Sequence, residues 1–430
     1  MSEQQHRLKG IVLPDGVPLD AVGDLGWSAL TDLETPVMVL HAEALRHNIA
    51  TMEAYVRDAG VLLAPHAKTS LSRYVVSAQL DGGAWGMTAA TVGQVRALHR
   101  WGVRRILLAN VLVDPKAIEW LARTLLATST HSTGHDQTDL WCYVDSVAGV
   151  DLLEHTLAEL HAERPLQVLV ERGYDGGRTG ARSREEALWT ARAVQRSARL
   201  VLSGVGGYEG LMHRDPDAGH PAGLVPFLDA IAETARDLVT ADLLEVEAPI
   251  VTAGGSSYFD QVVARLGPDI VGPRFRTVLR SGCYVTHDHG MYHRASPFDG
   301  RRTSPDAPTF RPALELLARV LSTPERGLAI VDFGRRDVPF DDQLPILLGR
   351  YADGVLQPLP RIPVAKVNDQ HGHLRLEDGH GEEPGSQHDL APGDLLAFGI
   401  SHPCGAFDRW PAIPLVDESH RVLDVVTVDM

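Results

Sequence analysis

Short apolar runs alternate with amphipathic segments along the first two thirds of the chain. The apolar runs predict buried β-strands at 36–40, 61–67, 84–88, 105–110, 140–144, 166–171, 200–204 and 249–253. Segments such as 42–59 and 91–101 place apolar residues at the three- and four-residue spacing of a helix. Strands that alternate with helices form parallel βα units. About eight units in about 250 residues predict a closed (β/α)8 barrel, with a doubly wound open sheet as the alternative.

The pattern of apolar and polar residues changes after about residue 275. Proline-rich loops there separate short β-rich runs at 327–333, 361–367, 394–399 and 421–428, which is typical of an all-β domain. We therefore expect an α/β fold with a barrel over 35–275 and a second, mainly antiparallel β domain over 276–430. The N-terminal segment 1–34 lacks the barrel pattern, and we expect it to pack on the β domain.

Composition and charge narrow the function. The 430 residues carry a formal net charge of −16, which argues against binding to nucleic acid and to anionic membranes. Three cysteines, Cys142, Cys283 and Cys404, are far apart and form no disulfide framework. The sequence shows neither a leader pattern nor an apolar stretch of membrane-spanning length. We therefore expect a cytoplasmic protein that acts on a small molecule.

Lys68 closes one of the predicted buried strands. Only four of the 40 basic residues are lysine, and lysine is rarely buried without a partner or a function. A desolvated lysine is a nucleophile toward carbonyls and can form a Schiff base. Taken by itself, Lys68 is better explained as a residue that ends a strand and extends its amine into water than as a catalytic lysine.

Two glycine-rich turns follow predicted strands. In the segment 252–257, adjacent glycines let the backbone approach a ligand, and successive N–H groups with serine hydroxyls can bind an anion. Barrel phosphate sites use the loops after the last two strands. The segment 203–210 follows the preceding strand and is expected to close the other side. Taken alone, the segment 252–257 is as compatible with a turn that binds no ligand as with a phosphate site. A Schiff-base lysine together with a phosphate-binding turn suggests pyridoxal 5′-phosphate.

The order of these motifs resembles that of the fold-type III pyridoxal-phosphate enzymes. Thr35 to Val37 followed by Pro65 to Thr69 is similar to the start of that fold. Over 33–417 the chain resembles the D-serine dehydratase / D-threonine aldolase branch, including sequences called amino acid deaminases. The resemblance implies an alanine-racemase-like barrel followed by a β domain, in a homodimer.

The resemblance also implies roles for individual residues. Lys68 matches the lysine that forms the Schiff base with the cofactor, and Arg178 matches the arginine beside the cofactor's phenolic oxygen. Tyr208 matches the tyrosine near the pyridine ring, where a neutral partner leaves the ring nitrogen unprotonated. The matching phosphate loop consists of Thr252, Gly254, Gly255 and Ser256.

His402 and Cys404 lie two residues apart near the end of the sequence. In an extended segment both side chains point to one face, and imidazole with thiolate suits Zn²⁺. From spacing alone, chance explains such a pair better than a metal site. The resemblance implies a His-x-Cys zinc pair here in D-serine dehydratase-like enzymes, and an aspartate in place of the cysteine in D-threonine aldolases. Mn²⁺ or another divalent ion stays open.

We therefore predict a pyridoxal-phosphate- and zinc-dependent D-amino-acid dehydratase that converts a D-3-hydroxy amino acid to a 2-oxo acid and ammonia. The first alternative is a retro-aldol lyase of the D-threonine aldolase kind, with His66 as a candidate base. An amino acid racemase and a non-catalytic pyridoxal-phosphate-binding protein are the further alternatives. Cys404 is the residue that favours dehydration over aldol cleavage.

Overall fold

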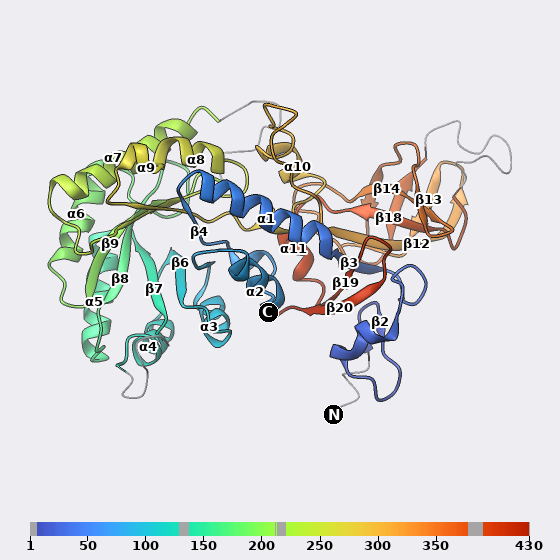
Figure 1. Ribbon diagram of the computed structural model, residues 1–430, viewed down its shortest axis with the longest axis horizontal. Coiled ribbons are helices and arrows are strands. Elements are labelled where there is room, and N and C mark those ends of the chain that lie inside the picture. The colour runs from blue at the N-terminus through green and yellow to red at the C-terminus, as the bar shows by residue number, and fades with distance from the viewer. Residues whose placement is uncertain (1–6, 129–136, 211, 213–220, 377–389, 430) are drawn as a thin grey trace. The chain divides into compact units, whose positions relative to one another are not determined.

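The computed structural model describes residues 7–128, 137–210, 212, 221–376 and 390–429 (Figure 1). Within these ranges, none of the helices has the length and apolar character needed to cross a membrane.

Eight parallel strands form a barrel, in the order β4-β11-β10-β9-β8-β7-β6-β5. They are β4 (Leu62–Leu63), β5 (Met87–Ala89), β6 (Arg105–Val111), β7 (Asp139–Val144), β8 (Leu166–Arg172), β9 (Leu200–Gly207), β10 (Ile250–Ala253) and β11 (Arg276–Leu279). The two ends of the sheet meet where the backbone of His66 pairs with that of Thr88. There the N–H of Thr88 donates to the carbonyl of Pro65 at 2.8 Å. The predicted barrel is confirmed.

Helices follow the barrel strands and cover the outside of the barrel (Figure 1). They are α3 (Val92–Arg100), α4 (Pro115–Thr124), α5 (Val147–Glu159), α6 (Arg184–Gln195), α7 (Leu224–Thr240), α8 (Phe259–Leu266) and α9 (Pro268–Val271). Thr91, Asp114, Ser146 and Ser183 each accept a backbone N–H of the helix that follows, as N-cap residues do. These caps fix where each helix begins after its strand.

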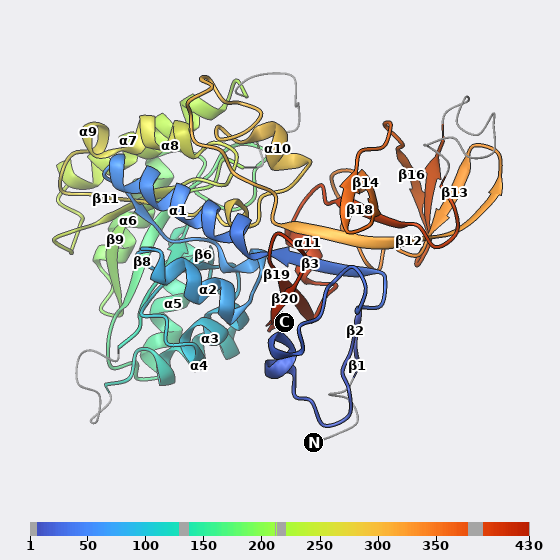
Figure 2. The same ribbon diagram turned by 45° about the vertical axis from the view of Figure 1, so that its right-hand side comes forward.

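A mainly antiparallel sheet forms the other part of the fold (Figure 2). Its strands are β3 (Val37–His41), β12 (Leu314–Glu325), β13 (Leu328–Val331), β14 (Ile346–Ala352), β15 (Val355–Gln357), β16 (Val364–Val367), β17 (Gly372–Arg375), β18 (Leu395–Gly399), β19 (Ala412–Val416) and β20 (Val422–Thr427). The main path runs β15-β14-β18-β12-β13-β17-β16, and β3 joins β12 to β19, which pairs with β20. Only the pairing of β3 with β19 is parallel among these. The predicted β domain is confirmed.

Short elements complete this part of the fold. The helices η4 (Cys283–Val285), α10 (Met291–Ala295) and α11 (Cys404–Phe407) flank the sheet strands in sequence. The N-terminal residues form β1 (Arg7–Leu8), β2 (Ile11–Val12) and η2 (Leu19–Leu25). The N–H of Ala29 donates to the carbonyl of His420 at 2.8 Å. This bond attaches the N-terminal segment to the turn before β20.

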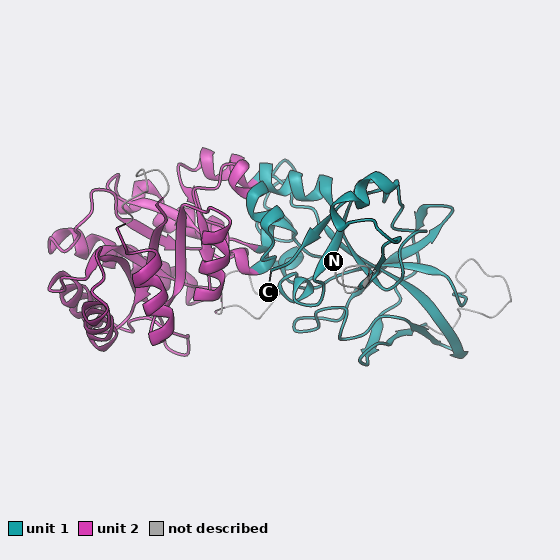
Figure 3. Ribbon diagram, turned by 90° about the horizontal axis from the view of Figure 1, so that it is seen from below, with its two compact units in different colours: residues 1–51, 69–78, 283–430 teal, residues 52–68, 79–282 magenta. Residues whose placement is uncertain are grey.

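The described chain divides into two compact units (Figure 3). One comprises 1–51, 69–78 and 283–430 and contains the antiparallel sheet; the other comprises 52–68 and 79–282 and contains the barrel. Two helices, α1 (Ala42–Asp58) and α2 (Arg73–Asp81), contribute residues to both units.

One strand assignment made from the sequence is wrong. The run 36–40 was predicted as the first barrel strand, but β3 pairs with β12 and β19. The eighth barrel strand is β11, which pairs with β10 and β4. A strand buried on both faces has the same apolar pattern in either sheet, so the pattern does not reveal its partner. Lys68 therefore follows the first barrel strand rather than the second.

Candidate active site and metal centre

Lys68 and His66 lie directly after β4. Lys68 occupies a single 3₁₀ turn, η3 (Ala67–Thr69), and His66 pairs by its backbone with Thr88. Burial holds the pKa of His66 well below its usual 6.5, and the nearby positive charge of Lys68 lowers it further. The imidazole is therefore neutral, and among the described residues its Nδ1 has no hydrogen-bond partner.

The loops after β8 and β9 bring Arg178 and Tyr208 together. Cζ of Arg178 lies 4.9 Å from the ring centroid of Tyr208, within the range of a cation–π contact. Arg182 donates to the carbonyls of Thr179 at 2.8 Å and Gly177 at 3.2 Å. These bonds fix the loop that carries Arg178, so its guanidinium is presented by an ordered segment.

A buried glutamate holds the glycine turn after β10. The carboxylate of Glu209 accepts the N–H groups of Gly254 at 3.1 Å and Gly255 at 2.7 Å. The resemblance matches Gly254 and Gly255 to the phosphate loop, and in the structure the N–H groups of both residues donate to Glu209. Gly254 has a φ of +103°, in the left-handed region that favours glycine. The buried Ser256 follows this turn.

Arg280, directly after β11, connects three barrel strands. Its buried guanidinium donates to Oγ1 of Thr252 at 2.7 Å and to the carbonyl of Gly207 at 2.7 Å. Oγ1 of Thr252 in turn donates to the carbonyl of Val278 at 2.7 Å. Arg280 was not predicted as a site residue, because β11, the strand that ends just before it, was not predicted. Thr252 was predicted to touch the cofactor, and the structure shows it positioned by Arg280.

All of these residues lie at or after the carboxyl ends of parallel strands, where barrel active sites are built. Among the described residues, the buried polar atoms of this region that have no hydrogen-bond partner include Nδ1 of His66, Oη of Tyr143 and Oε2 of Glu171. Tyr143 is the penultimate residue of β7, and burial raises its pKa to about 12, so its hydroxyl is a neutral donor. Native proteins rarely leave such atoms unpaired. The region therefore fits a polar ligand that completes their hydrogen bonds.

Three metal-binding side chains come together in the unit that contains the antiparallel sheet. Sγ of Cys283 lies 3.3 Å from Sγ of Cys404. With a ring nitrogen of His402, these ligand atoms all lie within 4.8 Å of one another. The pair His402 and Cys404 was expected on an extended segment, but Cys404 begins the short helix α11. Cys283 was not predicted as a partner, because it is 121 positions from Cys404 in the sequence.

Asp341 orients the imidazole of His402. Its Oδ2 lies 2.6 Å from Nδ1 of His402, which leaves Nε2 for the thiols, as in carboxylate–histidine–zinc arrangements. Burial lowers the pKa of His402, but the hydrogen bonds with Asp341 and Cys283 raise it to about 10. The hydrogen bond with Cys404 holds the pKa of Cys283 well below its usual 9.0, and His402 lowers it further. A low pKa favours the thiolate, the form that binds metals.

The donor set suits zinc. Two thiolates and one imidazole are ligands that Zn²⁺ prefers, and three protein ligands leave the fourth position open. The hydroxyl of Thr69, the residue after Lys68 in the sequence, lies 3.5 Å from Sγ of Cys283. An open fourth position is typical of catalytic rather than structural zinc.

Two family models match the chain. The model described as "Alanine racemase, N-terminal domain" matches residues 40–257, half of the chain. The model described as "Putative serine dehydratase domain" matches residues 313–416. The chain belongs to the fold-type III pyridoxal-phosphate enzymes of the D-serine dehydratase / D-threonine aldolase family. The chain is a pyridoxal-phosphate-dependent lyase.

Relatives of this fold-type III enzyme carry out two reactions. The chain is 28% identical over 356 residues to the 3-hydroxy-D-aspartate aldolase of Paracoccus denitrificans (strain Pd 1222), covering 81% of the chain and 82% of the relative. It is 27% identical over 406 residues to the D-threo-3-hydroxyaspartate dehydratase of Delftia sp. (strain HT23), covering 89% and 94%. The crystal structure of D-threonine aldolase from Filomicrobium marinum matches with a TM-score of 0.72 at 24% identity, over 93% of this chain and 96% of that one.

Proposed function

We propose that this lyase is a pyridoxal-phosphate- and zinc-dependent dehydratase that converts a D-3-hydroxy amino acid to a 2-oxo acid and ammonia. The cluster of Cys283, His402 and Cys404 carries the proposal, because the resemblance implies an aspartate in place of Cys404 in the aldolases. The similarity to the Delftia dehydratase over most of both chains supports the same reaction.

Four residues of the barrel are proposed to hold the cofactor. Lys68 would form the Schiff base with the carbonyl carbon of the cofactor, and Arg178 would contact its phenolic oxygen. Tyr208 would lie near the pyridine ring, and Ser256 would bind the phosphate. The buried atoms of His66, Tyr143 and Glu171 that find no partner in the described part of the chain fit a polar ligand in this region. When bound, pyridoxal phosphate delocalises the negative charge left on the substrate's α-carbon. Glu209 acts indirectly, because it fixes the turn that precedes Ser256.

Lys68 is the proposed base for the α-proton, which its Nζ accepts. His66 is unsuited to donate a proton at neutral pH, because burial and neighbouring positive charges keep its imidazole neutral. It serves instead as a hydrogen-bond acceptor beside Lys68. Loss of the α-proton and the β-hydroxyl gives an enamine, which water hydrolyses to the 2-oxo acid and ammonia.

The thiolate cluster is proposed to assist departure of the β-hydroxyl. Cys283, His402 and Cys404 would hold a Zn²⁺ ion, which would supply a Lewis acid for the hydroxyl. Asp341 keeps the His402 ring in the orientation that directs Nε2 toward the thiols. Hydroxide is a poor leaving group, so this assistance is what separates dehydration from simple proton exchange at the α-carbon.

A retro-aldol lyase is the second candidate, and one observation favours it. Neutral His66, whose Nδ1 has no partner among the described residues, can accept a hydrogen bond from the β-hydroxyl that must lose its proton in aldol cleavage. Removal of that proton and cleavage of the Cα–Cβ bond would give glycine and an aldehyde. The similarity to the Paracoccus aldolase supports this alternative.

Product analysis separates the two candidates. The enzyme is incubated with D-threo-3-hydroxyaspartate, D-serine and D-threonine, and ammonia, 2-oxo acid, glycine and aldehyde are measured. Dehydration predicts ammonia and 2-oxo acid in equal amounts from at least one substrate. Glycine with aldehyde as the sole products would overturn the proposal in favour of the aldolase. Lys68→Ala serves as the control and should form none of these products.

A further inference from the structure

A second cluster of metal-binding side chains shares no residue with the thiolate cluster. His41 ends β3, Glu315 is on β12, and His420 is in the turn before β20. One nitrogen or oxygen atom from each lies within 4.8 Å of the others. β3 pairs with β12 on one side and β19 on the other, so the sheet itself brings the three residues together.

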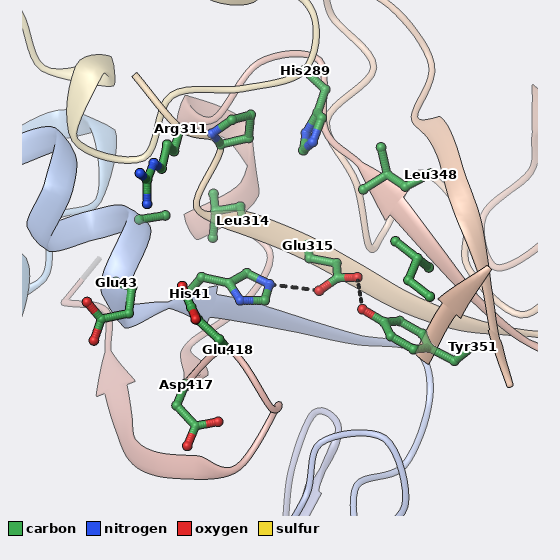
Figure 4. Close-up of a pocket in the computed structure, with 13 residues that line it drawn as sticks. His41, Glu43, His289, Arg311, Leu314, Glu315, Leu348, Tyr351, Asp417 and Glu418 are labelled. Carbon is green, nitrogen blue, oxygen red and sulfur yellow. Dashed lines mark hydrogen bonds and ion pairs between the residues drawn. The ribbon is translucent and has the colours of Figure 1, made fainter. Parts of the chain in front are cut away.

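The two imidazoles converge on one carboxylate oxygen. Oε2 of Glu315 lies 2.7 Å from Nε2 of His41 and 2.8 Å from Nε2 of His420. The hydroxyl of Tyr351 donates to the other oxygen, Oε1, at 2.9 Å, as Figure 4 shows. This hydrogen bond fixes the orientation of the carboxylate, as hydrogen bonds to ligating groups do in metal sites.

The cluster is buried but borders a cavity. The side chains of Glu315 and His420 are 7% and 9% exposed, and that of His41 is 23% exposed. A cavity of about 320 Å³ is lined by His41, Glu315 and Tyr351, with His289 pointing toward it from the opposite side (Figure 4). Such a volume holds more than one ion, so water or a small ligand has room beside it.

The charges around the cavity favour a cation. Its lining includes the carboxylates of Glu43, Asp417 and Glu418 in addition to Glu315, against one guanidinium, that of Arg311.

We propose that His41, Glu315 and His420 bind a second divalent transition-metal ion, with its remaining coordination positions facing the cavity. Two imidazoles and one carboxylate are the donor set of catalytic zinc sites and of non-haem iron sites, both of which keep open positions. In the hydrogen-bonded cluster, the two imidazole nitrogens are directed at the same carboxylate oxygen. A metal ion satisfies all three donors at once. This inference is independent of the dehydratase proposal.

Cobalt titration of the thiolate-free protein tests the second site by itself. The full chain carrying Cys283→Ser and Cys404→Ser is loaded with pyridoxal phosphate and titrated with Co²⁺. The proposal predicts one tightly bound equivalent, with the visible absorption of nitrogen and oxygen ligands and no thiolate-to-cobalt band. Adding His41→Gln and His420→Gln should abolish this equivalent. Glutamine keeps a hydrogen-bond donor near Glu315, and circular dichroism checks that the variant folds.

A matched control uses two exposed histidines. His155→Gln with His371→Gln, in the same thiolate-free background, should keep the bound cobalt. Absence of cobalt binding in the thiolate-free protein would overturn the proposal, as would binding that survives removal of His41 and His420. The spectrum of the thiolate-free protein decides the question even if the histidine variant does not fold. Failure of the dehydratase proposal has a different signature, namely the wrong products.

Discussion

Sγ of Cys283 lies 3.3 Å from Sγ of Cys404, although 121 positions separate the two residues in the sequence. The contact converts a two-residue His-x-Cys pair into a three-ligand cluster with His402. A metal held by three protein ligands keeps one position for substrate, and its affinity does not depend on substrate to complete the site. Cys283 therefore strengthens the metal hypothesis by supplying a third protein ligand.

Cys283→Ala should weaken zinc binding by at least about 100-fold, since even outer-shell partners of a metal cost about 10–100-fold when removed. Cys404→Ala should have an effect of similar size, measured by competition with a chromophoric chelator. Cys142→Ala is the control: it is a buried cysteine on β7 whose pKa burial raises to about 12, so it offers no thiolate. If Cys283→Ala kept its zinc affinity while Cys404→Ala lost it, the result would contradict the three-ligand cluster and support a site with only His402 and Cys404 as protein ligands.

Glu209→Gln should lower the free energy of unfolding by about 1.5–3 kcal/mol, the range for a hydrogen bond to a charged group. The carboxylate accepts two amides of the glycine turn, so the substitution should also speed the release of pyridoxal phosphate. Denaturant unfolding and cofactor absorbance after dialysis measure the two effects.

Glu245→Gln provides a comparison, because Glu245 also accepts a backbone N–H, that of Leu202 at 2.9 Å. It should lower stability without changing cofactor release. Equal cofactor release from Glu209→Gln and wild type would show that the turn does not depend on Glu209.

Arg280→Met should destabilise the barrel by about 3 kcal/mol, because it removes two buried hydrogen bonds to charged nitrogen. Thr252 and the carbonyl of Gly207 lose their partner at the same time. Arg276→Met, at the exposed start of β11, should change stability by less than about 0.5 kcal/mol. Thermal unfolding of both variants checks the difference, and comparable melting temperatures would contradict the assigned role.

Asp299 should give a pH-dependent contribution to stability. Burial raises its pKa, but the hydrogen bonds with His287 at 2.8 Å and His293 at 2.9 Å outweigh burial and hold the pKa below its usual 3.8. A depressed carboxyl pKa stabilises the fold above the unfolded-state value, and this stability is lost as the pH falls through the folded-state value. Asp299→Asn should therefore be less stable than wild type at neutral pH, with a gap that shrinks below pH 3.8.

Urea unfolding at neutral and acidic pH measures that gap. The exposed Asp306→Asn serves as the control and should show none at either pH. A gap for Asp299→Asn that grows on acidification would contradict the assigned sign.

The positions of helices and strands followed from apolar spacing because burial is largely local. The helix expected over 42–59 is α1 at Ala42–Asp58, and the strand expected over 166–171 is β8 at Leu166–Arg172. The partner of β3 could not be predicted, since the same apolar run suits a barrel and a β domain. Because β11 was not predicted, Arg280, which follows it, was not predicted as a site residue either.

In the candidate site, too, local sequence motifs could be recognised, but contacts between distant residues could not. Lys68 was singled out because it closes a predicted strand, and Arg178 and Tyr208 were named because the resemblance implies their roles. Glu209 is in such a motif as well, but its contacts are with amides 45 and 46 positions away. Contacts at that range depend on how the strands are arranged in space, which sequence spacing does not encode.

Metal dependence of ammonia release tests the central claim most directly. Enzyme stripped of metal by a chelator, with pyridoxal phosphate retained, is mixed with a D-3-hydroxy amino acid that the untreated enzyme converts, and ammonia is followed over time. The account predicts that stripping abolishes ammonia release, that Zn²⁺ restores it, and that Cys283→Ala/Cys404→Ala stays inactive at the same zinc concentration. Ammonia release at an undiminished rate from fully stripped enzyme would contradict it.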